Sequence, residues 1–477
     1  MNARSVAFES IADRLARVSE IALPPAPTRL VEPGRTMLTV LNGGRMSRFW
    51  LAGIGNAAIS LGLRHSFIEI DAIREAVGKN PSAAVAQINN IITQQKIGLV
   101  LNYAFNGVTD LPIDREWPGA YRNYFEVRGI PQCLIWADHP QWFTDKRALD
   151  PSLQPVFRSG NQFHFLKSQA HALELNRILG WPNCHELPCG ADPEVLQPVS
   201  GVTPEFDVVA IYGGADVQMP EWLVPFLSQD DPDPAEMNRA VAEQVWTALT
   251  NLWQTDAPPT LRPELEAWSA RIIELKLANP ALATIRHIGR LADEFPMSTW
   301  WMTAMYPVYF KATTILYAFR TWQRHFYLAY LSRYFRVGLF GGRWSHVGNA
   351  GQDNAMGQWV DFAQMPKVLA RGKIAFDIVG GWDEEGLTAK TFEIAACGMP
   401  MIHNQCVGLA EAFSDREISV FTTPKQAREA VQNLLDDSPR RIEMGQACHA
   451  RFLRQHTWAH RVQRMFEMMG MPIDVFR

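Results

Sequence analysis

Residues 373–400 read KIAFDIVGGWDEEGLTAKTFEIAACGMP. The stretch starts with an apolar run, Lys373–Ile378, continues through a polar loop and enters a helix that is predicted to begin close to Thr388. A buried strand that passes through a short loop into a helix is the repeating unit of parallel α/β sheets. The C-terminal half is therefore predicted to hold a Rossmann-like domain.

The same alternation of strand and helix extends on both sides of this stretch. The first half has predicted helices over about 47–63, 81–94 and 117–128, and its predicted strands are Met37–Leu41, Ser66–Ile70, Ile97–Asn102 and Gln132–Trp136. The other predicted strands of the second half are Asp207–Tyr212, Val337–Phe340, Met399–His403 and Ile418–Thr422. The sequence thus predicts an α/β protein with two doubly wound, Rossmann-like domains that face a cleft.

A long, Trp-rich segment of helical character, about 220–316, interrupts the second domain and is predicted to be a helical insertion. Trp300–Phe319 has the length of a membrane span, but Lys311 would cost about 2.5–3.5 kcal/mol near the centre of a bilayer. We therefore expect a buried helix there. Peripheral contact of the aromatic insertion with the inner face of a membrane, or with a second copy of the chain, stays open.

Composition and charge limit the classes of protein. The 477 residues exceed what one core usually supports, so two or three domains are expected. Apolar residues make up 47% and charged residues 20%, as in globular proteins, and the net charge of −4 predicts no nucleic-acid partner. The six cysteines lack metal-ligand spacing and the N-terminal stretch lacks the apolar core of a secretory signal. We therefore expect reduced thiols in a cytoplasmic protein.

Three glycine pairs follow predicted strands, at 43–44, 213–214 and 341–342. Glycine allows close approach of the backbone to a phosphate or a sugar, and ligands bind beyond the carboxyl ends of parallel strands. A plain tight turn explains any single pair equally well. Three pairs at the same edge favour a ligand cleft, with Gly43 and Gly44 on the acceptor side and Gly213, Gly214 and Gly342 on the donor side.

The helix that starts near Thr388 has the properties of a diphosphate site. A helix N-terminus offers unpaired N–H donors and partial positive charge, which suits the diphosphate of a nucleotide sugar. Lys390 adds a charged contact, and Glu393 is placed to accept hydrogen bonds from ribose hydroxyls. The alternative is that Glu393 is a first-turn carboxylate that only complements the helix dipole.

From about residue 337 to 468 the chain resembles the C-terminal domain of CgeB-like (spore-maturation-type) glycosyltransferases, which are relatives of the retaining, group 1 type GT-B enzymes. The matching pieces are Gly341–Trp344, Lys390–Glu393, Ala396–Pro400, Leu409–Phe413, Leu434–Arg440 and Arg451–Arg461, the last with His456, Trp458 and Arg461. The N-terminal half resembles the family more weakly, through Trp136–Pro140 and Leu187–Pro198.

The resemblance implies a GT-B fold, with an acceptor domain over 1–200, a donor domain over 201–460 and a final helix over 461–477 that crosses back to the first domain. It also implies retention of configuration and a contact from Glu393 to the donor ribose. Relatives carry an acid seven positions earlier, where this chain has Gly386, so a shifted loop would have to deliver Glu385. The usual Arg/Lys pair for the diphosphate is missing after Gly214. The expected donor-binding residues are Gly213, Gly214, Gly342, Arg343, Trp344, Glu385, Gly386, Leu387, Thr388, Lys390 and Glu393.

The predicted activity is therefore a hexosyltransferase-like transfer in glycan biosynthesis, from a nucleotide sugar to a protein, glycan or lipid-linked acceptor. Helix dipole and cations stabilise the leaving diphosphate, so neither a metal nor another cofactor is expected. Asp138 and His139 are the candidates for positioning or deprotonating the acceptor. Equally, Asp138 could simply cap a helix.

Two other functions compete with this prediction. Gly53–Ala58 fits a dinucleotide fingerprint with Asp71 after the next strand, as in an NAD-dependent oxidoreductase. Gly53 lies well beyond the strand end at Leu41, however, so close packing of a helix on the sheet is the preferred interpretation. The missing acid at Gly386 favours a non-catalytic scaffold instead. The Asp231–Asp233 motif, in a Pro/Asp-rich break, is interpreted as a solvated turn rather than a metal site.

Overall fold

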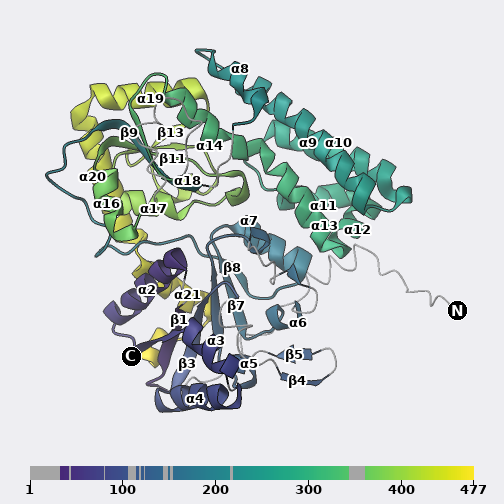
Figure 1. The fold of residues 1–477 in the computed structure, drawn as a ribbon, viewed down its shortest axis with the longest axis vertical. Helices are drawn as coiled ribbons and strands as arrows, with labels where there is room; N and C mark the ends of the chain where they lie inside the picture. Colours follow the sequence, from purple (N-terminus) through teal and green to yellow (C-terminus); the bar gives the residue numbers. More distant parts are fainter. Residues whose placement is uncertain are drawn as a thin grey trace.

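The computed structural model describes residues 33–41, 44–79, 81–105, 114–117, 120–122, 124–142, 149–150, 154–214, 219–342 and 360–477. These residues form two parallel sheets in two lobes, with a group of helices beside the second lobe (Figure 1). Two Rossmann-like domains that face each other make the GT-B fold, as predicted. The limits of each domain stay a prediction.

The first sheet has the strand order β2-β1-β3-β6-β7-β8, and all its neighbours are parallel. Its strands are β1 (Thr36–Leu41), β2 (His65–Glu69), β3 (Ile97–Tyr103), β6 (Gln132–Trp136), β7 (Gln162–Leu166) and β8 (Cys184–Glu186). The helices of this domain are α2 (Arg45–Ser60), α3 (Ile70–Lys79), α4 (Pro81–Gln94), α5 (Tyr124–Val127), α6 (Gln154–Phe157) and α7 (Gln169–Glu174). The four predicted strands are confirmed.

Two features of this domain differ from the sequence prediction. The helix expected over 117–128 is wrong, because β4 (Asp114–Trp117) and β5 (Ala120–Arg122) pair as an antiparallel ribbon and only α5 is helical. The strands β7 and β8 were not predicted. In β7 the polar side chains of Gln162 and His164 are fully buried and interrupt the apolar pattern.

The second sheet has the strand order β10-β9-β11-β12-β13 and is also parallel. Its strands are β9 (Phe206–Gly214), β10 (Val337–Gly342), β11 (Gly372–Asp377), β12 (Met401–Asn404) and β13 (Ser419–Phe421). Its helices are α16 (Met365–Leu369), α17 (Ala389–Ala396), α18 (Leu409–Ala412), α19 (Pro424–Asp436) and α20 (Ser438–Gln455). The apolar runs of β9 and β11 are buried, as expected for strands covered by helices on both faces.

Among the described residues, seven α-helices stand between β9 and β10, and most of them form the predicted insertion. Figure 1 shows this group of helices beside the second sheet. They are α8 (Val224–Leu227), α9 (Pro234–Asp256), α10 (Arg262–Ala278), α11 (Thr284–Glu294), α12 (Pro296–Ala304), α13 (Tyr306–Leu316) and α14 (Ala318–Leu331). Asp233 caps α9 through a hydrogen bond from Ala235 N, so the motif at 231–233 is a helix start. The stretch 300–319 is divided among α12, α13 and α14, and no helix in the described part of the chain has the length and apolarity to cross a membrane.

The last long helix, α21 (Trp458–Met469), returns to the first domain and packs on α2 (Figure 1). Gly53 of α2 makes this contact possible, since a Cβ there would lie 2.9 Å from Cδ1 of Trp458. A Cβ on Gly55 would instead meet Phe67 and His65 of β2. The dinucleotide-like glycines thus serve helix packing, on the sheet as predicted and also on α21.

Candidate active site: a cavity between the two sheets

A cavity of about 280 Å³ lies where the carboxyl ends of both sheets meet. The first domain contributes side chains from α2 and from the segments that follow β6 and β7; among these are Met46, Trp50, Asp138 and Lys167. The second domain contributes the ends of β9 and β10, one side chain of α14 and, from the segment 382–393, the residues Trp382, Asp383, Thr388, Ala389, Lys390 and Glu393. Parallel sheets bind ligands at this edge, so the cavity is the candidate site.

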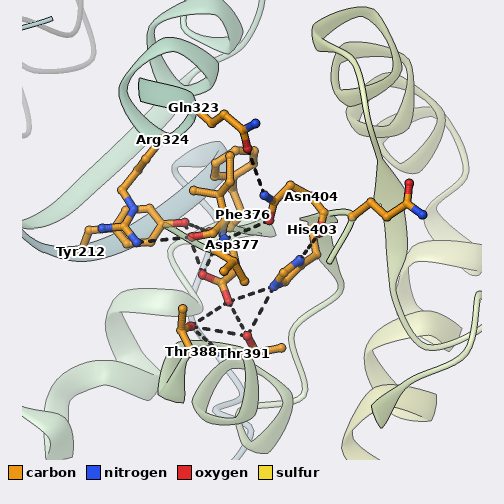
Figure 2. A network of polar contacts seen from close by, with 12 residues as sticks. Tyr212, Gln323, Arg324, Phe376, Asp377, Thr388, Thr391, His403 and Asn404 are labelled. Carbon is orange, nitrogen blue, oxygen red and sulfur yellow. Dashed lines mark hydrogen bonds and ion pairs between the residues drawn. The ribbon is translucent and has the colours of Figure 1, made fainter. Parts of the chain in front are cut away.

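Asp377, the last residue of β11, anchors the helix that enters the cavity (Figure 2). Its Oδ2 accepts hydrogen bonds from Thr391 Oγ1 at 2.6 Å and from Thr388 Oγ1 at 3.2 Å. Thr388 is also the N-cap of α17, because its side chain accepts from Thr391 N. The strand end and the helix start are therefore tied together by side chains.

Further contacts hold the Asp377 carboxylate in its ionised form. Tyr212 donates to Oδ1 at 3.4 Å, and His403 Nε2 lies 3.5 Å from Oδ2 (Figure 2). Burial opposes ionisation, but His403, Thr391 and Arg324 outweigh it and lower the pKa of Asp377 to about 2. The N-terminus of α17 therefore rests on a buried negative charge at all ordinary pH values.

Lys390 and Glu393, on the cavity side of α17, contact each other, and Glu393 also contacts the opposite domain. Lys390 Nζ lies 2.6 Å from Glu393 Oε2, and Trp50 Nε1 of α2 donates to Glu393 Oε1 at 3.3 Å. Glu393 is only 1% exposed and lies beyond the first turn of α17. The alternative in which Glu393 merely complements the helix dipole from the first turn is therefore wrong.

Arg324 of α14 brings a cation into the cavity that was not predicted. Its guanidinium lies 4.3 Å from the centre of the Tyr212 ring and 5.2 Å from that of Trp382. Nη2 donates to Ile378 O at 3.3 Å, whereas the buried Nε has no partner among the described residues. The local sequence gives no indication that Arg324 belongs to a site, because this residue lies in a helix rich in aromatic residues and is distant from the glycine pairs along the chain.

Lys167 and Asp383 form an ion pair across the two domains, and they too were not predicted. Lys167 follows β7, is 5% exposed and also lies 3.5 Å from Asp138. Burial alone would lower the pKa of Lys167, but Asp383 and Asp138 raise it above its usual value. The amine is therefore charged. Recognition of the strand β7 would have singled out Lys167 as a residue at the sheet edge.

Asp138 and His139, the predicted acceptor-side pair, are separated by the structure. Asp138 lines the cavity and has a side chain that is 38% exposed. The ring of His139 is fully buried, with Nε2 at 3.0 Å from Glu174 Oε2 and Nδ1 accepting from Gln141 N. Burial and then Lys167 lower the pKa of His139 to about 3, so the ring is neutral. In this position His139 packs and cannot exchange protons with a ligand in the cavity.

The segment 383–387 also differs from expectation. Glu385 points away from the cavity and pairs with Arg286 of α11 at 2.9 Å, while Leu387 is buried. Gly386 packs on the first domain, since a Cβ there would lie 2.9 Å from Lys167 O. The carboxylate that this loop delivers to the cavity is Asp383.

Two of the three predicted glycine pairs, 213–214 and 341–342, lie at strand ends, as expected. Gly213 and Gly214 end β9, and Gly342 ends β10 in register with Gly214. The neighbouring Gly341 lines the cavity with φ of 90°, where a Cβ would meet Tyr212 O at 2.9 Å. Gly44 precedes α2 as its N-cap. The predicted residues Gly43, Arg343 and Trp344 lie outside the described residues.

Residues 320–467 match a known family. Its description is "Glycosyl transferase-like", and the matched part runs from α14 to α21. It therefore includes Arg324, Lys390 and Glu393 of the cavity, and also Asp377, which anchors α17. The comparison does not test the finer resemblance to the CgeB-like group, which stays a prediction.

The chain is also similar to solved structures, and no curated protein matches it. A sucrose-phosphate synthase from Thermosynechococcus elongatus is 10% identical, with 91% of this chain and 98% of that chain covered and a TM-score of 0.43. HepE from Anabaena, in complex with UDP and glucose, is 12% identical, with 91% and 99% covered and a TM-score of 0.42. The trehalose-6-phosphate synthase OtsA is 9% identical, with 92% and 99% covered and a TM-score of 0.40.

Proposed function

We propose that this protein is a glycosyltransferase that moves a sugar from a nucleotide-sugar donor to a hydroxyl acceptor. The observation that carries the proposal is the convergence of a helix N-terminus, two cations and a buried carboxylate on one interdomain cavity. These are α17, Arg324, Lys390 and Glu393. The glycosyltransferase-like match over 320–467 supports the same activity.

In the proposed complex the second domain binds the nucleotide part of the donor. The N–H groups at the start of α17 that Thr388 does not cap and the cations of Lys390 and Arg324 bind the diphosphate. Glu393 accepts hydrogen bonds from the ribose hydroxyls, with Trp50 keeping its carboxylate in place from the opposite domain. The residues Gly213, Gly214, Gly341 and Gly342 allow the backbone to approach the donor.

The proposed reaction breaks the bond between the anomeric carbon and the diphosphate oxygen, which leaves with the electron pair. Fixed dipoles and cations that face this developing charge commonly supply about 3–4 kcal/mol for each donor. The acceptor oxygen forms the new bond, and its proton passes to Asp138 or to the departing phosphate. In this proposal the two cations replace a metal, and transfer proceeds with retention, as the CgeB-like resemblance implies.

A binding screen followed by one substitution tests the proposal. Purified protein is titrated with UDP, GDP, ADP, the corresponding sugar nucleotides and NAD(H), and unfolding is followed by differential scanning fluorimetry. A ligand at a hundred times its Kd stabilises the folded state by about 2.7 kcal/mol. We expect one nucleoside diphosphate and its sugar nucleotides to stabilise the protein. NAD(H) as the only stabilising ligand would point to an oxidoreductase.

Glu393→Ala is expected to weaken binding of that nucleoside diphosphate about tenfold to a hundredfold, because hydrogen bonds to a charged group contribute about 1.5–3 kcal/mol. The matched control is Glu429→Ala, which removes an exposed carboxylate of α19. Equal affinity in the two variants would remove Glu393 from the site. Binding without sugar transfer or donor hydrolysis would indicate a scaffold.

A further inference from the structure

The loop that carries Asp383 is held by the helical insertion. Glu384 Oε1 accepts a hydrogen bond from Thr284 N at 3.1 Å and lies 3.6 Å from Lys276 Nζ of α10. The carbonyl oxygen of Glu384 accepts from Arg320 Nη1 at 2.6 Å. Both the side chain and the backbone of Glu384 are thus tied to the helices between β9 and β10.

Hydrogen bonds from the same insertion fix both the position and the orientation of the Glu385 carboxylate. Ala283 N donates to Oε1 at 3.1 Å, and Arg286 donates from Nε at 3.1 Å and from Nη2 at 2.9 Å to Oε2. A guanidinium that binds a carboxylate through two N–H groups restrains both position and orientation. Arg286 Nη2 also donates to Gln169 Oε1 of α7 at 3.0 Å, so this pair reaches the first domain.

The backbone of Glu384 is strained where these contacts act. Its φ of 44° lies in the left-handed region, which costs a residue other than glycine about 1–3 kcal/mol. This conformation turns Glu384 and Glu385 toward the insertion while Asp383 faces the cavity and Lys167. The contacts with the insertion therefore select which carboxylate of Asp383-Glu384-Glu385 enters the cavity.

We infer that the helical insertion positions Asp383 to bind hydroxyls of the transferred sugar, with Arg286 and Lys276 as positioning residues. The inference rests on the proposed function and assigns a role to the insertion. It also assigns a class of sugar. Lys167 pairs with both Asp383 and Asp138, so its charge is already matched by two carboxylates and this part of the cavity favours a neutral sugar over a uronate.

The test compares Arg286→Ala, Arg286→Lys and Asp383→Asn with a control variant, Arg271→Ala. Arg271 lies on α10 of the same insertion and pairs with Glu274 and Glu294, away from the loop. Three quantities are measured: the Kd of the nucleoside diphosphate found in the screen, and the kcat and KM for transfer from its neutral sugar nucleotide. Transfer from the matching uronate donor gives the selectivity.

We expect Arg286→Ala to lower kcat about tenfold to a hundredfold, since a misplacement of about 1 Å has this effect. The Kd of the nucleoside diphosphate, which lacks the sugar, should stay within about twofold of the wild type, and the preference for the neutral donor should shrink. Arg286→Lys keeps the charge but not the paired hydrogen bonds, so its kcat should be intermediate. Arg271→Ala should behave as the wild type.

A double variant separates positioning from a general loss of structure. If Arg286 acts through Asp383, Arg286→Ala combined with Asp383→Asn should be no slower than the slower single variant. The inference would be overturned if the losses in kcat of the two single variants multiplied in the double variant, or if Arg286→Ala left kcat unchanged. If Arg286→Ala does not fold, Arg286→Lys takes its place in the same cycle. A wild-type protein that neither binds a nucleoside diphosphate nor transfers a sugar would instead refute the proposed function.

Discussion

Burial keeps two histidines of the first domain, His164 and His139, neutral, and the hydrogen bonds of His164 suit the neutral ring. Trp136 Nε1 donates to His164 Nδ1 at 3.2 Å, so the proton of the ring lies on Nε2, which donates to Phe157 O at 3.1 Å. A second proton on Nδ1 would face another N–H group. Burial is the main cause that lowers the pKa of both His164 and His139 to about 3.

This chemistry predicts the acid sensitivity of the fold. The pKa of each of these histidines is lower in the folded state than in the unfolded state. The contribution of each neutral ring to stability is therefore present above about pH 6.5 and is lost as the pH falls toward about 3. Burial raises the pKa of Glu174 and of Glu384 to about 7. The contribution of these two side chains to stability is therefore present at low pH and is lost as the pH rises from about 4.5 to 7. We therefore expect His164→Phe to reduce the loss of unfolding free energy on acidification, although it lowers stability at pH 7. Urea unfolding from about pH 7 to pH 4 measures both, and equal slopes would contradict the assignment.

Helix α17 has only two turns, and its start is determined by one side chain that acts twice. Thr388 accepts from Thr391 N as the N-cap and donates to Asp377 of β11. The cap therefore joins helix to strand as well as satisfying a helix N–H. Because the same turn faces the cavity, the order of this helix start matters for any anion bound there.

Thr388→Ala is expected to lower the free energy of unfolding by about 1 kcal/mol, the usual effect of losing an N-cap. It should also weaken binding of the nucleoside diphosphate, because the N–H groups of the first turn lose their fixed direction. Thr388→Ser keeps the hydroxyl and is the matched control. Chemical denaturation and calorimetric titration of the three proteins provide the measurements. Alanine and serine variants that behave alike would show that the hydroxyl has no such role.

At the scale of the molecule, the helix α21 joins the two lobes by packing on α2. Trp458 is 2% exposed and fills the space that Gly53 and Gly190 leave, since a Cβ on either glycine would lie 2.9 Å from its ring. Arg461 extends this contact by donating to Cys189 O and to His456 Nδ1. The relative placement of the lobes therefore depends on a close, glycine-dependent contact.

Gly53→Ala is expected to destabilise the protein by about 1–3 kcal/mol, because the buried indole of Trp458 has no space into which to retreat. The control is Gly289→Ala in the exposed part of α11, where an added Cβ meets nothing within 4 Å. That variant should stabilise the protein by about 0.5–1 kcal/mol through helix propensity. Thermal unfolding of both variants distinguishes the contact from a general effect of replacing glycine. A neutral Gly53→Ala would show that the lobes adjust to one another.

Much of the architecture follows from local sequence. Apolar runs that end in glycine or in a polar loop predicted nine strands of the two sheets, and the start of α17 near Thr388 was predicted with Lys390 and Glu393 on its cavity side. These features depend on hydrogen bonds and burial within a few residues, so the sequence contains them. The ribbon β4–β5 was missed, and the strand β7 was missed because the buried polar side chains of Gln162 and His164 interrupt its apolar pattern.

Only the tertiary structure shows which side chains line the cavity, because these side chains come from distant segments of the chain. Arg324, Lys167 and Asp383 stand in three separate parts of the sequence, and nothing local marks them as neighbours. The choice of Asp383 over Glu385 depends on Arg286 and Lys276 of the insertion, which hold the two glutamates away from the cleft. His139, an acid–base candidate by sequence, has a buried and neutral ring in the structure. Charge pairing and burial act between segments, and therefore the fold assigned these roles.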